Sequence, residues 1–261
     1  MSQTGLKIVA LIFMFGDHVG EFIPGTPFIL RIAGRISAPL FVFCARDGFR
    51  HTHDRKIYIV RLYRFSLLMG CINRRLAALF PEPYAVCSNN IFTSLFLIFL
   101  FAGMQTKADS SQISQKSAAV FAAINLLTFF SYLLLKELLP APAVHLLRAA
   151  LPCVLTSEGN ILVFAMGLIF FYSLPDKEKI YTRYTLLCAL YRIVTLSARP
   201  ENYSLVQWMF KTNIQWIQIL ALPIILCYNN KRGRGLKYLF YRFYPVHIVI
   251  LYIISNIIYQ M

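Results

Sequence analysis

The sequence predicts an all-α protein, a polytopic integral membrane helical bundle of about nine transmembrane helices. Of its 261 residues, 58% are hydrophobic and only 14% are charged, and the mean hydropathy is +0.60. These values are typical of polytopic membrane proteins and lie outside the range of soluble domains. Apolar runs long enough to cross a bilayer recur along the chain, and no soluble stretch is long enough for a second domain. We therefore expect residues 1–261 to form a single transmembrane domain.

Five of the expected spans lie in the first half of the chain. The turn 24–27 (Pro-Gly-Thr-Pro) separates the first two, so these helices should be antiparallel neighbours. The charged segment 50–56 and the polar segment 109–117 separate later spans. Each run has roughly the length needed to cross the hydrocarbon core. The expected spans are Leu6–Ile23, Phe28–Gly48, Ile57–Phe80, Ile91–Gln105 and Ser117–Leu139.

The second half of the chain supplies four more apolar runs and one shorter segment. Prolines bracket residues 140–156, which are too few to span and suit an interfacial or re-entrant helix. The remaining expected spans are Gly159–Leu174, Ile180–Leu196, Leu205–Tyr228 and Leu239–Tyr259.

The formal net charge of +15 has two interpretations. In a soluble protein it would suggest nucleic acid, but we expect none, because no aromatic-basic motif for nucleic acid is present. Basic loops beside anionic membrane lipid explain the charge better. Most of the 26 Lys and Arg residues fall in alternate loops, with Arg74 and Arg75 as the exception. The positive-inside rule then predicts a cytoplasmic amino terminus and an outer carboxyl terminus.

Asp17 and His18 lie deep in the first expected span, where ionisable groups are costly and usually functional. Lys7 precedes His18 by eleven residues, which places both on nearly the same helix face about 16 Å apart. Such a pair would suit a long substrate with an anionic head and a reactive tail. Lys7 could equally mark only the helix end. Asp17 points about 100° away from His18 and should pair with a cation on another helix.

Arg31 and Arg35 are spaced four residues apart, so they share a helix face in the second span. One of them could neutralise Asp17. Two arginines exceed the need of a single carboxylate, and guanidinium groups suit phosphates and developing oxyanions. We therefore expect at least one of them to contact substrate.

Four further residues are candidates for binding substrate or cofactor. His51 and Arg55 belong to a charged cytoplasmic loop, which either faces lipid headgroups or binds the nucleotide end of a cofactor. Asn90, together with Asn89 before it, begins the fourth span and could be only a helix cap. His247 is the second histidine expected within a span.

Several of these residues lie in motifs that resemble the TraX family of membrane acyltransferases. The family is similar to a wider transmembrane acyltransferase superfamily, whose signature is a basic residue, ten positions and a catalytic histidine; Lys7 and His18 have that spacing. The similar segments lie near both ends of the chain, and residues 100–237 are similar only in hydropathy. The segments are 6–20 (with Lys7, Asp17 and His18), 31–41 (with Arg31 and Arg35), 48–52 (with His51), 90–93 (with Asn90) and 243–247 (with His247).

The resemblance implies an acetyltransferase of the bacterial inner membrane that takes its acetyl group from cytoplasmic acetyl-CoA and needs no metal. It implies His18 as the catalytic histidine, with Asp17 beside it, and a role near the CoA phosphates for Arg31 and Arg35. The family includes the F-type pilin acetylase, so the first expectation for the acceptor is the amino terminus of a small pilin-like peptide. A hydroxyl group of an envelope glycan is the alternative acceptor.

A different class of function also accommodates the buried charges. In a proton- or anion-coupled transporter, Asp17, His18 and the arginines would form a relay. Such transporters usually contain inverted repeats with broken helices in matching halves. The sequence contains no such repeat, which favours the enzyme.

Overall fold

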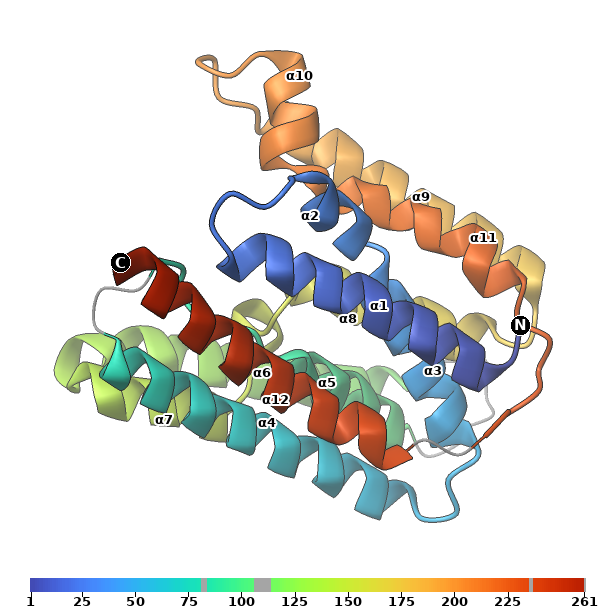
Figure 1. The fold of residues 1–261 in the computed structure, drawn as a ribbon. Helices are drawn as coiled ribbons and strands as arrows, with labels where there is room; N and C mark the ends of the chain where they lie inside the picture. The colour runs from blue at the N-terminus through green and yellow to red at the C-terminus, as the bar shows by residue number, and fades with distance from the viewer. Residues whose placement is uncertain (81–83, 106–113, 235–236, 261) are drawn as a thin grey trace.

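The computed structural model describes residues 1–80, 84–105, 114–234 and 237–260. Within this part of the chain every regular element is helical, so the all-α prediction is confirmed. Figure 1 shows the arrangement. The elements are α1 (Gln3–Phe22), α2 (Ile29–Gly34), α3 (Ser37–Arg50), α4 (Arg55–Leu79), α5 (Ile91–Met104), α6 (Gln115–Leu138), α7 (Ala141–Ala150), η1 (Val154–Thr156), α8 (Asn160–Ser173), α9 (Lys177–Ser197), α10 (Leu205–Gln207), η2 (Trp208–Thr212), η3 (Ile214–Leu220), α11 (Ala221–Leu226) and α12 (Lys237–Gln260).

The fold supports fewer membrane spans than the nine that the sequence predicts. In the described residues two helices, Gln115–Leu138 and Leu239–Gln260, are long and apolar enough to cross a membrane, or three if the bent pair Leu205–Thr212 and Ile214–Leu226 counts as one span. The other expected spans differ for two reasons. Helices α5 and α8 are apolar but have only 14 residues each. Helices such as α4 and α9 are longer but carry several charged side chains.

Two of the expected helices are interrupted. The run 28–48 divides into α2 and α3, and Gly34 ends α2 against the side chain of Asp17. A Cβ atom at Gly34 would lie 2.2 Å from the Asp17 Cβ, so no larger residue could occupy this position without movement. The run 205–228 is bent by 64° where a π-helical turn meets a 3₁₀ helix.

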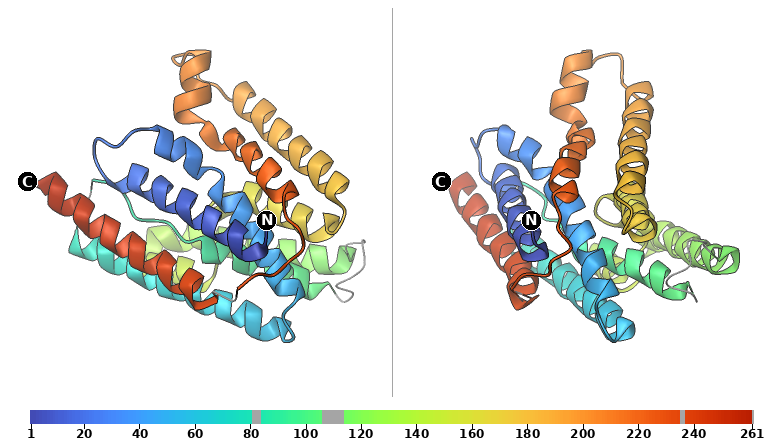
Figure 2. Two further views of the ribbon diagram at one scale, coloured as in Figure 1. Left: turned by 45° about the vertical axis from the view of Figure 1, so that its right-hand side comes forward. Right: turned by 90° about the vertical axis from the view of Figure 1, so that its right-hand side faces the viewer.

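Helix α1 lies in the centre of the bundle, between α2 and α3 on one side and α12 on the other. Its apolar face, which includes Leu6, Ala10 and Met14, is buried in the main hydrophobic core. Helix α4 packs on α5, α7 and α12. At the edge of the bundle, α6 buries a single side chain, Phe121 (Figure 2). An almost wholly exposed apolar helix of this length is consistent with a lipid-facing position.

Helices α1 and α12 run in parallel, as their contacts show. Lys7 lies over the ring of Phe240 near the start of both helices, and Ser255 donates a hydrogen bond to the Phe22 carbonyl near their ends. His18 and His247 meet between these points. Two residues that are far apart in sequence are thereby placed side by side in the core.

Candidate active site

The centre of the site is a pair of buried imidazoles. His18 Nδ1 lies 2.7 Å from His247 Nε2, and the two ring planes are nearly parallel, with an interplanar angle of 20°. Both side chains are 4% exposed. The structure therefore brings together the two histidines that the sequence placed within spans.

The hydrogen bonds around the pair define the tautomers of both rings. His247 Nδ1 lies 2.6 Å from the Phe243 carbonyl oxygen, which can only accept, so Nδ1 carries the proton. In the neutral ring Nε2 is then an acceptor, and His18 Nδ1 must donate to it. The remaining nitrogen, His18 Nε2, keeps a lone pair and accepts from the Asn89 amide at 3.3 Å. His18 is therefore held with its basic nitrogen directed away from His247.

Asn89 connects this basic nitrogen to a carboxylate. Its Nδ2 atom also donates to Glu21 Oε2 at 3.2 Å. The Asn89 carbonyl accepts a hydrogen bond from Asn73 Nδ2 of α4, which positions this segment before α5. Glu21 lies on α1, close to one helical turn beyond His18, and its side chain is 22% exposed.

Asp17 and the two arginines form an ion-pair cluster on the other face of α1. Arg35 contacts Asp17 Oδ2 at 2.5 Å, and Arg31 lies 2.8 Å from both Asp17 Oδ1 and Glu21 Oε2. Asp17 is thus paired with arginines of the next helical segments, as one interpretation of the sequence expected. Because neither arginine lines the pocket described below, this geometry favours a pairing role over contact with a cofactor; the role in CoA binding stays a prediction.

A second polar cluster supports the rings from the side of α5. Glu158 Oε2 accepts from the Asn90 backbone N–H at 2.5 Å and from the Tyr244 hydroxyl at 3.1 Å. The same hydroxyl accepts from the Ile91 N–H at 3.2 Å. The Tyr244 ring meets the His18 ring edge-on, with 6.0 Å between centroids. Glu158 and Tyr244 thus fix the start of α5 beside the histidine pair, and Asn90 contributes its backbone to this arrangement.

A pocket of about 570 Å³ leads towards the histidines between α1, α3, α4, α5 and α12. This volume is in the range of cavities that hold a small molecule or cofactor. Met14, Ile91 and Tyr244 line its deep end. His18 follows Met14 by one helical turn, so the imidazole pair lies just beyond that end of the pocket.

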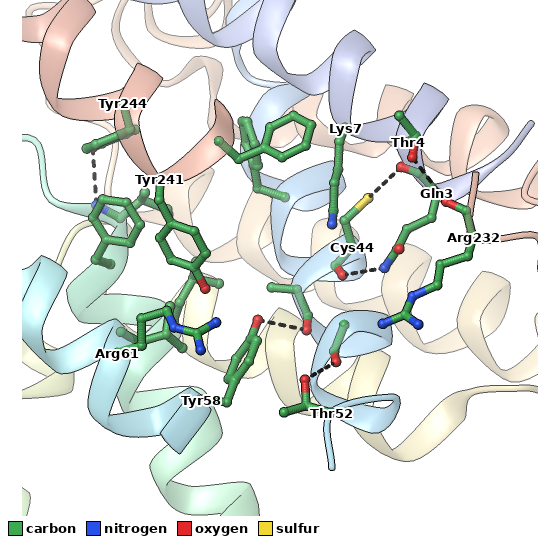
Figure 3. A pocket seen from close by; sticks show the side chains of 18 of the residues that line it. Gln3, Thr4, Lys7, Cys44, Thr52, Tyr58, Arg61, Arg232, Tyr241 and Tyr244 are labelled. Atoms are coloured by element: carbon green, nitrogen blue, oxygen red, sulfur yellow. Dashed lines mark hydrogen bonds between the residues drawn. The ribbon is translucent and has the colours of Figure 1, made fainter. Parts of the chain in front are cut away.

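The other end of the pocket is basic and aromatic. Lys7, Arg61 and Arg232 extend into the same space from three segments of the chain (Figure 3). Arg234 lines the pocket as well, and Arg61 stacks over the Tyr241 ring at 5.9 Å. The pocket is therefore cationic at one end and apolar near the histidines.

A short strap positions the two arginines from the chain before α12. The backbone N–H groups of Gln3 and Thr4 donate to the carbonyls of Lys231 and Arg232, at 2.8 and 3.3 Å. The Thr4 hydroxyl donates to the Arg234 carbonyl at 2.5 Å. Since the first N–H groups of a helix have no partner within it, the start of α1 is satisfied by this strap. The strap in turn holds Arg232 and Arg234 at the rim of the pocket.

His51 and Arg55 lie near the pocket but do not line it. His51 Nδ1 is 2.8 Å from the Asp47 carbonyl oxygen, and 54% of its side chain is exposed. Arg55 lies over the Phe49 ring at 5.6 Å. Their proposed contact with a cofactor is untested by this geometry. In the described part of the chain, no group of three His, Cys, Asp or Glu side chains could hold a metal ion.

The pocket and the two polar clusters include residues that the sequence did not single out. Glu21 and Glu158 lie at or beyond the ends of expected spans, where polar residues are ordinary. Arg61, Arg232 and Arg234 belong to the basic segments on which the positive-inside rule rests, and nothing in their spacing distinguishes them from other loop charges. Glu21 could have been noticed, because it follows Asp17 by four residues and so shares its helix face.

The family comparison agrees with the motifs. A model of the family described as TraX protein matches residues 2–255. The chain belongs to the TraX family. No curated protein and no solved structure matches it. Membership covers nearly the whole chain, including the segment 100–237 whose sequence resembled the family only in hydropathy. The TraX family is associated with F-pilin acetylation.

Proposed function

We propose that this TraX-family protein is a membrane-embedded acetyltransferase that transfers an acetyl group from cytoplasmic acetyl-CoA to an acceptor at the other side of His18. The acceptor we favour is the amino terminus of a small membrane peptide such as a pilin. The observation that carries the proposal is the pocket with cations at one end and His18 just beyond the other.

The pocket has the polarity that acetyl-CoA requires. The donor carries phosphates at its nucleotide end and a thioester at the end of an uncharged arm. Arg61, Arg232, Arg234 and Lys7 would bind the phosphates, since guanidinium groups form paired hydrogen bonds with phosphate oxygens. The Lys7-to-His18 distance of about 16 Å along α1 is of the order of the pantetheine arm.

His18 is oriented to act as the general base. Its Nε2 lone pair would accept a proton from the acceptor as the acceptor attacks the thioester carbonyl carbon. The new bond to the acceptor forms, the C–S bond breaks, and the imidazolium returns the proton to the departing thiolate. During this step His247 Nε2 would accept the hydrogen bond from His18 Nδ1 and so stabilise the charged ring.

The family and the composition support the cellular setting. Two to three described helices are apolar enough to span a membrane. We therefore place the protein in the bacterial inner membrane as a multi-pass protein, with the amino terminus and the basic pocket mouth towards the cytoplasm, where the donor is present.

Transfer of label from acetyl-CoA tests the proposal. Purified protein in detergent is incubated with [¹⁴C]acetyl-CoA and either a pilin-like peptide with a free amino terminus or an envelope glycan. We expect label in the peptide and its loss in His18→Ala. Label in the glycan alone would keep the enzyme class and change the acceptor. No binding of acetyl-CoA and no transfer would overturn the proposal.

A further inference from the structure

The side of His18 that faces away from the pocket carries a second group of polar atoms. The Asn89 Nδ2 atom lies 3.3 Å from His18 Nε2 and 3.2 Å from Glu21 Oε2. A single N–H₂ group thus bridges the basic nitrogen and a carboxylate. Neither Glu21 nor Asn89 lines the donor pocket, whose deep end is formed by Met14, Ile91 and Tyr244.

Glu21 is partly exposed on the surface of the bundle. Its side chain is 22% exposed, whereas His18 is buried, so the carboxylate is the more accessible of the two groups. Glu21 lies seven residues beyond Met14 on α1, about 10 Å farther along the helix axis. The basic nitrogen of His18 therefore stands between the donor pocket and this open carboxylate.

The hydrogen-bonding groups of this cluster match an amine better than a hydroxyl. Every contact of Glu21 given by the described residues goes to Oε2, which leaves Oε1 as an acceptor. Asn89 Oδ1 is buried without a hydrogen-bond partner in the same part of the chain. These two oxygens are acceptors for several N–H groups beside His18 Nε2. A primary ammonium offers three donors and a positive charge, whereas a hydroxyl offers one donor and none.

The negative charge of Glu21 is less fully neutralised by arginines than the charge of Asp17. Asp17 is contacted by both Arg35, at 2.5 Å, and Arg31, at 2.8 Å. Among the described residues, the ion pairs of Glu21 are limited to one with Arg31, which Asp17 also contacts. A bound ammonium would give Glu21 a cationic partner of its own, while Asp17 keeps the two guanidiniums.

We infer that Glu21 and Asn89 form the acceptor subsite, which binds a primary amine next to His18 Nε2. The inference rests on the proposed function and names the residues that select an amine as its acceptor. The bound ammonium releases one proton to solvent. Its nitrogen then attacks the thioester carbon, a C–N bond replaces the C–S bond, and the second proton passes through His18 to the thiolate. The products are an amide and the free thiol.

The test compares Glu21→Gln with the wild type. Glutamine keeps the shape of the side chain and can still accept from Asn89, but it removes the charge that attracts the ammonium. The acceptor probes are a short apolar peptide with a free amino terminus and the same peptide with that amino group replaced by a hydroxyl. We expect Glu21→Gln to raise KM for the amine peptide roughly tenfold or more, as for the loss of a hydrogen bond to a charged group. The dissociation constant for acetyl-CoA should be unchanged.

Glu178→Gln is the matched control, because Glu178 lies exposed in the first turn of α9, away from the site. It should leave both constants at the wild-type value. Size-exclusion profiles show whether each variant is folded. Equal KM for the amine peptide in Glu21→Gln and wild type would overturn the inference, as would a wild type that acetylates the hydroxyl peptide as efficiently. If the wild type binds no acetyl-CoA, the proposed function itself fails.

Discussion

His18 and His247 are 229 residues apart in the chain, yet His18 Nδ1 lies 2.7 Å from His247 Nε2. Because His247 Nδ1 is committed to the Phe243 carbonyl, the proton between the rings belongs to His18. The second histidine therefore acts on the first by orienting it. It leaves His18 Nε2, which lies on the side of Asn89 and Glu21, as the nitrogen able to accept a proton.

The two histidines should differ in what their removal does. We expect His18→Ala to lower kcat by at least about 10²-fold, the usual contribution of a general base, with acetyl-CoA binding retained. His247→Ala should lower kcat less and leave KM for acetyl-CoA unchanged. His247→Gln should recover part of the loss, because a glutamine oxygen can accept from His18 Nδ1. Steady-state kinetics of the three variants checks this order; near wild-type rates in His18→Ala would remove it as the base.

The basic end of the pocket should control donor affinity. Arg61 lines the pocket and stacks on Tyr241, whereas Arg64, one turn later on α4, is exposed and does not line it. We expect Arg61→Ala to weaken acetyl-CoA binding about tenfold, because it removes a charge-assisted contact to phosphate. Arg64→Ala makes the same change in net charge and should have little effect. Calorimetric titration with acetyl-CoA measures both. Equal losses in the two variants would indicate a general effect of charge instead of a phosphate site.

The sequence indicated much of the helix content and the central residue of the site. The apolar run 6–23 is informative because it contains Asp17 and His18, and ionisable groups at the depth of the hydrocarbon core are costly. This run corresponds closely to α1. The run 91–105 likewise corresponds to α5. Periodicity and charge are local properties, so they predict the elements on which such residues lie.

The partners of those residues could not be derived in the same way. His247 meets His18 only because α12 runs parallel to α1, and Glu158 reaches Asn90 across 68 residues. Neither contact can be predicted from the spacing of residues along one helix. The bend in 205–228 and the split of 28–48 also depend on tertiary packing, as Gly34 against Asp17 shows. Hydropathy alone therefore predicts more membrane spans than the lengths and compositions of the observed helices support.

Arg35 should contribute mainly to stability. Its guanidinium and the Asp17 carboxylate are 14% and 12% exposed, so removing one partner leaves a poorly solvated charge. We expect Arg35→Ala to cost about 2–3 kcal/mol, less than a fully buried pair, because Arg31 still contacts Asp17. Thermal unfolding in detergent measures the loss. The double variant Asp17→Asn/Arg35→Ala should regain part of it, since the uncompensated carboxylate is gone. Unchanged stability together with weaker acetyl-CoA binding would instead assign Arg35 to the donor.

The orientation of the protein in the membrane should follow from the direction of α1 and α12. These helices are parallel. Asp54 precedes α4, and Tyr84 follows its other end. The Tyr84 backbone N–H donates to Asn256 near the end of α12, so the end of α4 lies beside the end of α12. If the basic pocket mouth faces the cytoplasm, residue 53 should be cytoplasmic and residue 259 outside. His53→Cys and Tyr259→Cys are suitable probes because both residues are exposed. His53 is preferred to Asp54, whose carboxylate caps α4 by accepting from Ile57 N–H.

Each probe is placed in a variant without the native cysteines, of which Cys71 and Cys227 are exposed and would otherwise react. A membrane-impermeant maleimide added to intact cells should label position 259 and spare position 53, and in inverted vesicles the pattern should reverse. Labelling of position 53 from outside would contradict the orientation. It would also separate Arg61, Arg232 and Lys7 from the cytoplasmic pool of acetyl-CoA. Labelling of both positions from one side would contradict a membrane-spanning arrangement of α4 and α12. The contacts of Arg61 with Tyr241 and of Tyr84 with Asn256 place positions 53 and 259 at opposite ends of these two helices.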